Sequence, residues 1–176
     1  LKILKKKKNL RLIDATNFTM KSFINFNSAN ESFLTQSEDT EKFNIKNFKV
    51  VSKKKPSKSQ LQNLIFAFNI CRYVKSNAIV LASQETTVGI GSGQPNRLDS
   101  CQIAIDKMNK FQNLNEEVVA ASDAFFPFVD GIEKLVQSGV TAVIQPSGSI
   151  RDKEVIKFAN QTDTILVFSK TRHFRH

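Results

Sequence analysis

The chain has 176 residues, of which 40% are hydrophobic, and a formal net charge of +10 at pH 7. This length is enough to bury the core of one ordinary domain, so we expect a globular protein. No stretch approaches the roughly 20 apolar residues that a membrane-spanning helix needs, and residues 1–5 lack the apolar block of a signal peptide. These features favour a cytosolic protein with no membrane partner. Because the sequence does not begin with Met, we expect a fragment of a longer protein.

The positive charge is concentrated in the first third of the chain. Residues 1–60 hold 14 Lys and Arg against 5 Asp and Glu, whereas residues 61–176 hold 12 against 11. Residues 5–8 are four lysines without interleaved aromatic residues, which favours solvated lysines over a nucleic-acid-binding stripe. A basic RNA-binding protein is an alternative, but the near-neutral second part argues against it. We therefore expect no nucleic-acid partner.

Several common catalytic chemistries lack their residues in this sequence. Cys71 and Cys101 are far apart and have no His or Cys at metal-ligand spacing, so we expect buried, reduced thiols and no bound metal. The two histidines, His173 and His176, stand in the last four residues, and the G-x-S-x-G motif of a hydrolase nucleophile is absent. The His and Cys ligands of the zinc-dependent deaminases are also missing.

Residues 2–58 show short apolar groups interrupted by Asn, Ser and Lys, which predicts strands and loops. After Pro56 the pattern changes to helical spacing over more than three turns, with Ser57 or Ser59 as the predicted N-cap. The apolar residues of this helix are Leu61, Leu64, Ile65, Phe68, Cys71 and Val74. We therefore divide the chain into an irregular, Lys-rich connecting part, residues 1–56, and an α/β part, residues 57–176.

The α/β part continues with strands and helices in alternation. Residues 78–82 and 87–90 predict a hairpin whose turn is residues 83–86, and a glycine cluster ends it. The later elements are a helix at 97–110, a strand at 118–121, a helix at 129–137, a strand at 140–144, a helix through 155–159 and a strand at 165–168. Ser149 and Asp152, before the last helix, have the spacing of a capping box. This order predicts a three-layer α/β/α sandwich with a leading hairpin.

Four polar clusters stand where these strands end and helices begin, which is where open α/β sheets bind ligands. They are residues 75–77, 89–94, 122–128 and 146–149. The third holds three Phe around Pro127, which either pack under the sheet or stack on a flat ligand. Gly89, Gly91 and Gly93 resemble a phosphate cradle, but the full spacing of a nucleotide-binding motif is missing and a tight turn is favoured. Residues 172–176 are either a frayed basic tail or part of a site.

Five segments, in order and at matching spacing, resemble the AICAR transformylase domain of the bifunctional purine biosynthesis proteins. They are residues 74–80, 87–97, 122–128, 145–152 and 172–176. The likeness extends from about Pro56 to the last residue, includes the Lys-rich residues 4–12 and is weak between residues 13 and 50. It implies a cytidine-deaminase-like three-layer α/β/α sandwich without zinc, of which this chain is the carboxy-terminal portion.

The resemblance also implies roles for individual residues. Asn77, Phe125 and Arg172 match positions that bind AICAR, with the Phe near the heterocycle and the Arg suited to the 5′-phosphate. His176 matches a terminal His that supports the catalytic pair. The positions that match folate contacts are Arg97, Leu98, Asp130, Ser149 and Ile150.

By the same resemblance, the protein transfers a formyl group from formyltetrahydrofolate to AICAR, and the full-length protein is also expected to have IMP cyclohydrolase activity and to be a homodimer. The Lys-His pair that moves protons in this family has no match here. We expect that pair upstream, and we expect the fragment alone to be inactive. A non-catalytic folate- or nucleotide-binding module that lacks the pair is the alternative.

The chain departs from the family pattern at three places. Residues 29–36 stand where the family has a Gly-Gly-Leu-Val-Gln stretch. Pro95 and Asn96 stand where Met-Ser is common, and Val129 stands where Arg is usual. We expect the first change to alter a loop and the other two to weaken folate contacts.

Overall fold

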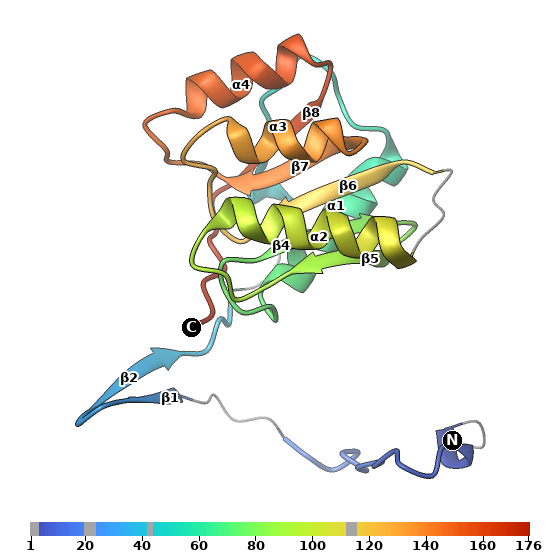
Figure 1. Ribbon diagram of the computed structural model, residues 1–176, viewed down its shortest axis with the longest axis vertical. Coiled ribbons are helices and arrows are strands. Elements are labelled where there is room, and N and C mark those ends of the chain that lie inside the picture. Colours follow the sequence, from blue (N-terminus) through green and yellow to red (C-terminus); the bar gives the residue numbers. More distant parts are fainter. Residues whose placement is uncertain (1–3, 20–23, 42–43, 112–115) are drawn as a thin grey trace. The chain divides into compact units, whose positions relative to one another are not determined.

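The computed structural model describes residues 4–19, 24–41, 44–111 and 116–176 (Figure 1). The chain divides into two compact units, Leu1–Glu38 and Asp39–His176. All five family-like segments and the whole predicted α/β part lie in the second unit, so that unit carries the candidate site. Within the described residues, no helix is both long and apolar enough to span a bilayer.

The described residues of the first unit include an antiparallel hairpin. Its elements are the 3₁₀ turn η1, Leu4–Lys6, and the paired strands β1, Ile24–Ala29, and β2, Ser32–Ser37. Asn30 stands in the hairpin turn with a φ of 56°, a left-handed conformation that Asn adopts more readily than most non-glycine residues. The family departure at residues 29–36 therefore falls on a hairpin whose turn needs no glycine at this position.

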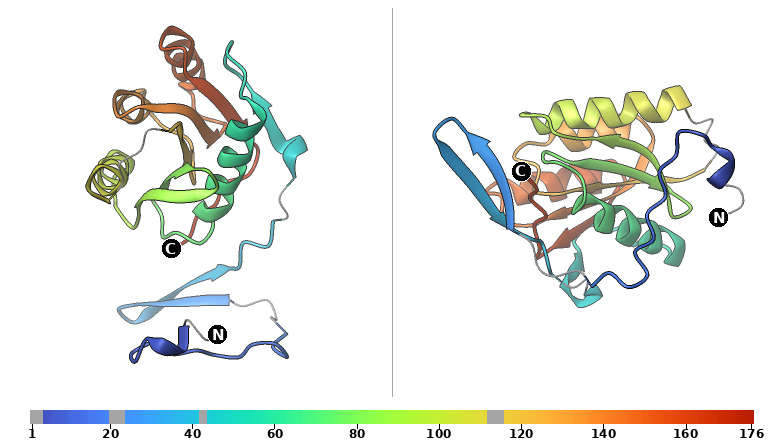
Figure 2. Two further views of the ribbon diagram at one scale, coloured as in Figure 1. Left: turned by 90° about the vertical axis from the view of Figure 1, so that its right-hand side faces the viewer. Right: turned by 90° about the horizontal axis from the view of Figure 1, so that it is seen from below.

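The second unit is a six-stranded mixed sheet with helices on both faces (Figure 2). Its strands are β3 Phe48–Val50, β4 Ile79–Ser83, β5 Thr86–Gly91, β6 Val118–Ser122, β7 Val140–Pro146 and β8 Ile165–Ser169. They lie in the order β3-β8-β7-β6-β4-β5. Strands β6, β7 and β8 are parallel, whereas β4 runs antiparallel to β6 and β3 antiparallel to β8.

Helices cover the two faces of this sheet unequally. They are α1 Lys58–Cys71, α2 Arg97–Phe111, α3 Asp130–Gln137 and α4 Asp152–Gln161, and η2 Ile45–Asn47 is a 3₁₀ turn. One face packs against α1 through Leu64 and Phe68. The other face packs against α2, α3 and α4 through residues such as Cys101, Ile132 and Val155. The predicted three-layer α/β/α order is therefore confirmed.

Two helix starts show how local chemistry sets the boundaries. The Ser57 hydroxyl accepts a hydrogen bond from the N–H of Gln60, and the Gln60 side chain accepts one from the N–H of Ser57. The predicted cap of α1 is thus confirmed as a capping box. The predicted capping box of Ser149 and Asp152 is wrong, because Arg151 is the N-cap residue of α4. Asp152 instead accepts hydrogen bonds from the backbone of the preceding loop, including the N–H of Ser149.

Two glycines of the predicted turn lie inside a strand. A Cβ on Gly91 would stand 1.8 Å from the carbonyl oxygen of Ser100, and one on Gly89 would stand 2.1 Å from that of Ala104. Strand β5 and helix α2 are therefore too close for any side chain at these positions. The prediction of a tight turn is wrong for Gly89 and Gly91, and holds for Gly93, which has a φ of 68°.

Gly91→Ala should lower the free energy of unfolding by about 1–3 kcal/mol, because the added methyl group must push α2 away from β5. Urea-induced unfolding followed by circular dichroism measures the change. Thr86→Ala, at the exposed start of the same strand, is the control and should cost less than about 1 kcal/mol. A Gly91→Ala chain as stable as the wild type would contradict the close packing.

Candidate functional site at the carboxyl edge

Strand topology brings the five family-like segments to one edge of the sheet. The carboxyl ends of the parallel strands lie together, and Pro146 of β7 pairs there with Ser169 of β8. Ile79, the first residue of antiparallel β4, pairs with Ser122 of β6 and with Gly91 of β5. Open α/β sheets bind ligands at such an edge. We call it the carboxyl edge: residues 75–78, 91–98, 122–130, 146–152 and 169–176.

Asp123 is fully buried in the carboxyl edge. Its Oδ1 accepts a charge-assisted hydrogen bond from Nη1 of Arg97, which is itself only 9% exposed. Its Oδ2 accepts hydrogen bonds from the Ser76 hydroxyl at 2.6 Å and from the N–H of Ala78 at 3.0 Å. Its backbone carbonyl accepts one from the N–H of His173 at 2.9 Å. Asp123 therefore joins the start of β4, the start of α2 and the carboxy-terminal tail.

Arg97 and Asn77 extend this network. Nη1 of Arg97 also donates to the Ser122 hydroxyl at 2.8 Å, and Nη2 donates to Oδ1 of Asn77 at 2.7 Å. Nδ2 of Asn77 donates to the backbone carbonyls of Gln94 at 2.9 Å and Pro95 at 3.0 Å. Contacts within the protein therefore fix the Asn77 amide. The family departure at Pro95 does not remove this acceptor, because the acceptor is a backbone carbonyl.

Phe125 and Arg172 lie against each other at the same edge. The guanidinium carbon of Arg172 is 5.0 Å from the centroid of the Phe125 ring, within the range of a cation–π contact. Phe125 is half-buried, whereas Arg172 is exposed. Gly148 lies beside them, since a Cβ there would be 3.1 Å from Nη2 of Arg172. A second pair of this kind, Arg151 over Phe128 at 4.6 Å, lies in the neighbouring segments.

The two histidines of the tail have different surroundings. His173 is buried, with Nδ1 2.5 Å from Oδ2 of Asp39 and its ring centroid 4.6 Å from that of Phe68. His176 is exposed and stacks with Phe174, with ring centroids 5.8 Å apart. The tail is therefore anchored at His173 and not frayed there. The supporting catalytic role of His176 stays a prediction.

The five residues predicted to contact folate belong to three segments of the carboxyl edge and differ in exposure. Arg97 is buried, Leu98 and Ser149 are half-buried, and Asp130 is exposed. The side chain of Ile150 is fully exposed. Their assignment to folate stays a prediction.

A hollow of about 310 Å³ opens at the carboxyl edge beside Asn77. Its lining residues are Ser76, Asn77, Gly93, Gln94, Pro95, Phe174 and His176. Two residues of the predicted site, Asn77 and His176, thus share one hollow. Its volume is at the lower end of the range for small-molecule sites, which suits part of a ligand.

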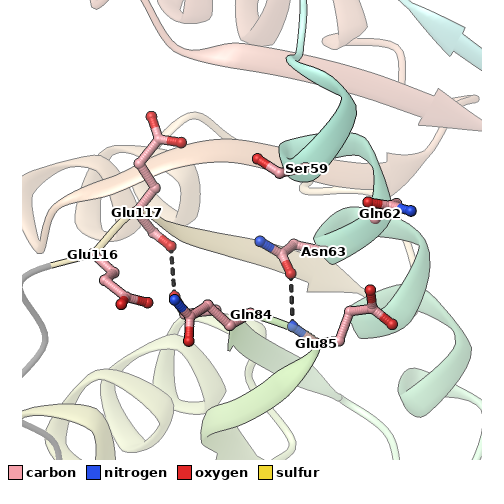
Figure 3. A pocket seen from close by; sticks show the side chains of 8 residues that line it. Ser59, Gln62, Asn63, Gln84, Glu85, Glu116 and Glu117 are labelled. Atoms are coloured by element: carbon pink, nitrogen blue, oxygen red, sulfur yellow. Dashed lines mark hydrogen bonds between the residues drawn. The ribbon is translucent and has the colours of Figure 1, made fainter.

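A second hollow, of about 510 Å³, lies at the opposite edge of the sheet (Figure 3). Its lining residues are Ser59, Gln62, Asn63, Ser83, Gln84, Glu85, Glu116 and Glu117. Hydrogen bonds within the protein hold part of this lining, since Oδ1 of Asn63 accepts one from the N–H of Glu85. None of the five family-like segments contributes a lining residue, so this hollow is separate from the predicted site.

Neither cysteine is a candidate nucleophile. Cys71 and Cys101 are buried free thiols, as predicted. Burial raises the pKa of Cys101 to about 12 and holds the pKa of Cys71 well above its usual value, where the charge of Asp123 adds to the effect. Among the residues that the structure describes, no group of three or more His, Cys, Asp and Glu is placed to hold a metal ion.

Comparison with known proteins places the chain in a family. The sequence pattern of the AICARFT/IMPCHase bienzyme family matches residues 1–107. The chain belongs to this family. The match includes Asn77, Arg97 and Leu98.

Curated relatives extend the likeness over the whole chain. The bifunctional purine biosynthesis protein PurH of Ligilactobacillus salivarius is 46% identical over 179 residues, covering 100% of this chain and 34% of the relative. The proteins of the same name from Buchnera aphidicola and Persephonella marina are 43% and 42% identical, covering 99% and 97% of this chain and 34% and 33% of theirs. This chain therefore spans about a third of the length of the curated relatives it matches.

Asp123 and His173 organise the carboxyl edge, but neither role was predicted from the sequence. Asp123 stands in a segment that was singled out for its aromatic residues. The signal that could have found it is a carboxylate directly after the apolar strand β6, at a strand end that must be buried by the layers around it. His173 was considered only with the tail, because its partner Asp39 lies in the part where the pattern is irregular.

Both thiols should resist the thiol reagent DTNB at pH 8 in the native chain and react once the chain is unfolded in urea, because they are buried and protonated. Rapid labelling of the native wild type would contradict this account.

The raised folded-state pKa of the two thiols also stabilises the fold below about pH 8.5. This stability is lost at higher pH, because the thiols of the unfolded chain ionise there while the buried thiols stay protonated. The free energy of unfolding should therefore fall less between pH 8 and pH 10 in Cys101→Ala than in the wild type.

Proposed function

We propose that this chain is part of an enzyme that transfers the formyl group of formyltetrahydrofolate to the amine of AICAR in purine biosynthesis. The observation that carries the proposal is the Arg172–Phe125 pair at the carboxyl edge of a chain that belongs to the AICARFT/IMPCHase family. IMP cyclohydrolase activity belongs to the same proposal for a longer protein, because the relatives are named bifunctional and this chain spans a third of their length.

AICAR has a flat heterocycle and a 5′-phosphate, and the carboxyl edge offers a partner for each. Phe125 presents an aromatic ring for stacking, and Arg172 supplies charge-assisted hydrogen bonds to phosphate. Asn77 has fewer hydrogen-bonding groups available to AICAR, because Nδ2 already donates to two carbonyls and Oδ1 already accepts from Arg97. Its remaining capacity for AICAR is the second lone pair of Oδ1.

Formyltetrahydrofolate is the proposed co-substrate, and it occupies the rest of the carboxyl edge. Its proposed contacts are Arg97, Leu98, Asp130, Ser149 and Ile150. Leu98 and Ile150 offer apolar surface to a ring system, and Ser149 and Asp130 offer polar groups. The usual Arg before Asp130 is Val129 here, so we expect this side of the folate site to bind more weakly than in relatives that keep the Arg.

The groups that move protons are proposed to lie outside this chain. By the resemblance, a Lys-His pair performs that step and His176 supports it. Residues 1–56 are proposed to connect that part of the transformylase to the α/β part at 57–176. The full enzyme is proposed to be a cytosolic homodimer, and the 176-residue chain alone is proposed to bind substrate without turning it over.

Calorimetric titration of the 176-residue chain with AICAR tests the proposal. Arg172→Ala should weaken binding by about 1.5–3 kcal/mol, tenfold or more, because a charged hydrogen bond to the phosphate is lost. Phe125→Ala should weaken it by about 1–3 kcal/mol, because a stacking surface is lost. A reduced folate should then bind to the AICAR-loaded chain.

Arg151→Ala is the matched control for this titration. Arg151 is also an arginine over a Phe ring, but it is not among the proposed AICAR contacts, and its loss should leave AICAR affinity within about twofold. Two results would contradict a preformed half-site, meaning the part of the AICAR site that this chain supplies. One is equal AICAR affinity of the wild type, Arg172→Ala and Phe125→Ala, and the other is a folded wild type that binds no AICAR.

A further inference from the structure

We propose that Asp123 is a positioning residue of the substrate site, an inference that rests on the function proposed above. The carboxylate of Asp123 is fully buried, so it does not reach a ligand in solvent. It acts through the residues that it bonds. One branch leads through Arg97 to Asn77, and the other leads to the tail that carries Arg172.

The first branch fixes the orientation of Asn77. Asp123 and Ser122 hold Nη1 of Arg97, and this leaves Nη2 directed at Oδ1 of Asn77. An Asn amide can flip, because its oxygen and nitrogen have nearly the same shape. The Arg97 donor selects the orientation in which Oδ1 faces Arg97, so that Nδ2 faces the carbonyl of Gln94. Asp123 thereby sets which amide atom Asn77 presents to its surroundings.

The second branch holds the tail at two residues, His173 and Arg175. The backbone carbonyl of Asp123 accepts the N–H of His173, the residue after Arg172. The Ser76 hydroxyl donates to Oδ2 of Asp123 and accepts the N–H of Arg175 at 3.0 Å. The N–H of Ser76 also donates to the carbonyl of Arg175 at 2.9 Å. Arg172 is therefore joined to the network by its neighbour in the chain.

Asp123→Asn is the informative substitution, because it keeps the size of the side chain and removes one acceptor. Both carboxylate oxygens accept from donors, namely Arg97 on one side and Ser76 with Ala78 on the other. An amide NH₂ must face one of these donors, so one side of the network has to open. Either side leads to a proposed AICAR contact, so affinity should fall whichever side opens.

The first test measures AICAR binding to the 176-residue chain at a temperature where circular dichroism shows that each variant is folded. Asp123→Asn should bind AICAR at least about tenfold more weakly than the wild type. Ser52→Ala is the matched control, since Ser52 is buried, accepts the N–H of Leu166 and donates to the carbonyl of Lys54, and none of these residues belongs to the carboxyl edge. It should lower stability and leave affinity unchanged, whereas a purely structural Asp123 predicts unchanged affinity in both.

The second test needs no ligand and separates this inference from the proposed function. In Asp123→Asn, the nuclear magnetic resonance signals of the Asn77 side-chain amide should shift, and hydrogen exchange of the His173 or Arg175 N–H should quicken at least about tenfold. Ser52→Ala should change neither. A wild type that binds no AICAR overturns the binding half-site, while these signals still decide the positioning role. Asn77 signals and tail exchange that match the wild type would overturn the positioning role itself.

Discussion

The carboxyl edge depends on a buried ion pair between Arg97 and Asp123. A carboxylate removed from water costs several kcal/mol unless its oxygens are well bonded, and here both oxygens and the backbone carbonyl accept hydrogen bonds. The donors come from segments far apart in the sequence, before β4, at the start of α2 and in the tail. The requirement to satisfy one charge therefore brings together four of the five segments that form the candidate site.

This arrangement separates residues that hold the site from residues that are available to a ligand. Asn77 and Arg97 spend most of their hydrogen-bonding capacity on the protein itself. Arg172, Phe125 and Ile150 keep accessible surface at the same edge. Preorganisation of this kind lowers the entropy cost of binding, because the side chains are already placed. It suits the proposed function, in which this chain supplies substrate contacts and the proton-moving groups lie outside it.

Much of the fold could be predicted from the sequence because its signals are local. The capping box at Ser57, the spacing of apolar residues in α1 and the alternation after residue 78 each act within a few residues. The errors have a common cause in tertiary contact. The sequence predicts a turn at Gly91, but the glycine is there because the backbone of α2 lies against it. The sequence also predicts Ser149 as an N-cap, but the side chain of Asp152 accepts a hydrogen bond from the Ser149 N–H in the preceding loop.

The candidate site could be predicted only as a set of segments. Polar residues after apolar strands predicted where ligands bind, and the family resemblance named Phe125 and Arg172, which lie against each other in the structure. The role of Asp123 was not visible, because it depends on which segments meet in space. His173 was missed for the same reason, since Asp39 is 134 residues away in the chain.

A double-mutant cycle on Arg97→Gln and Asp123→Asn, measured by urea unfolding, tests most directly whether this pair organises the edge. If it does, the double variant should lose less stability than the two single variants together, with a coupling energy of at least about 2 kcal/mol. Additivity within about 0.5 kcal/mol would mean that the two residues act independently and that the carboxyl edge is held by other contacts.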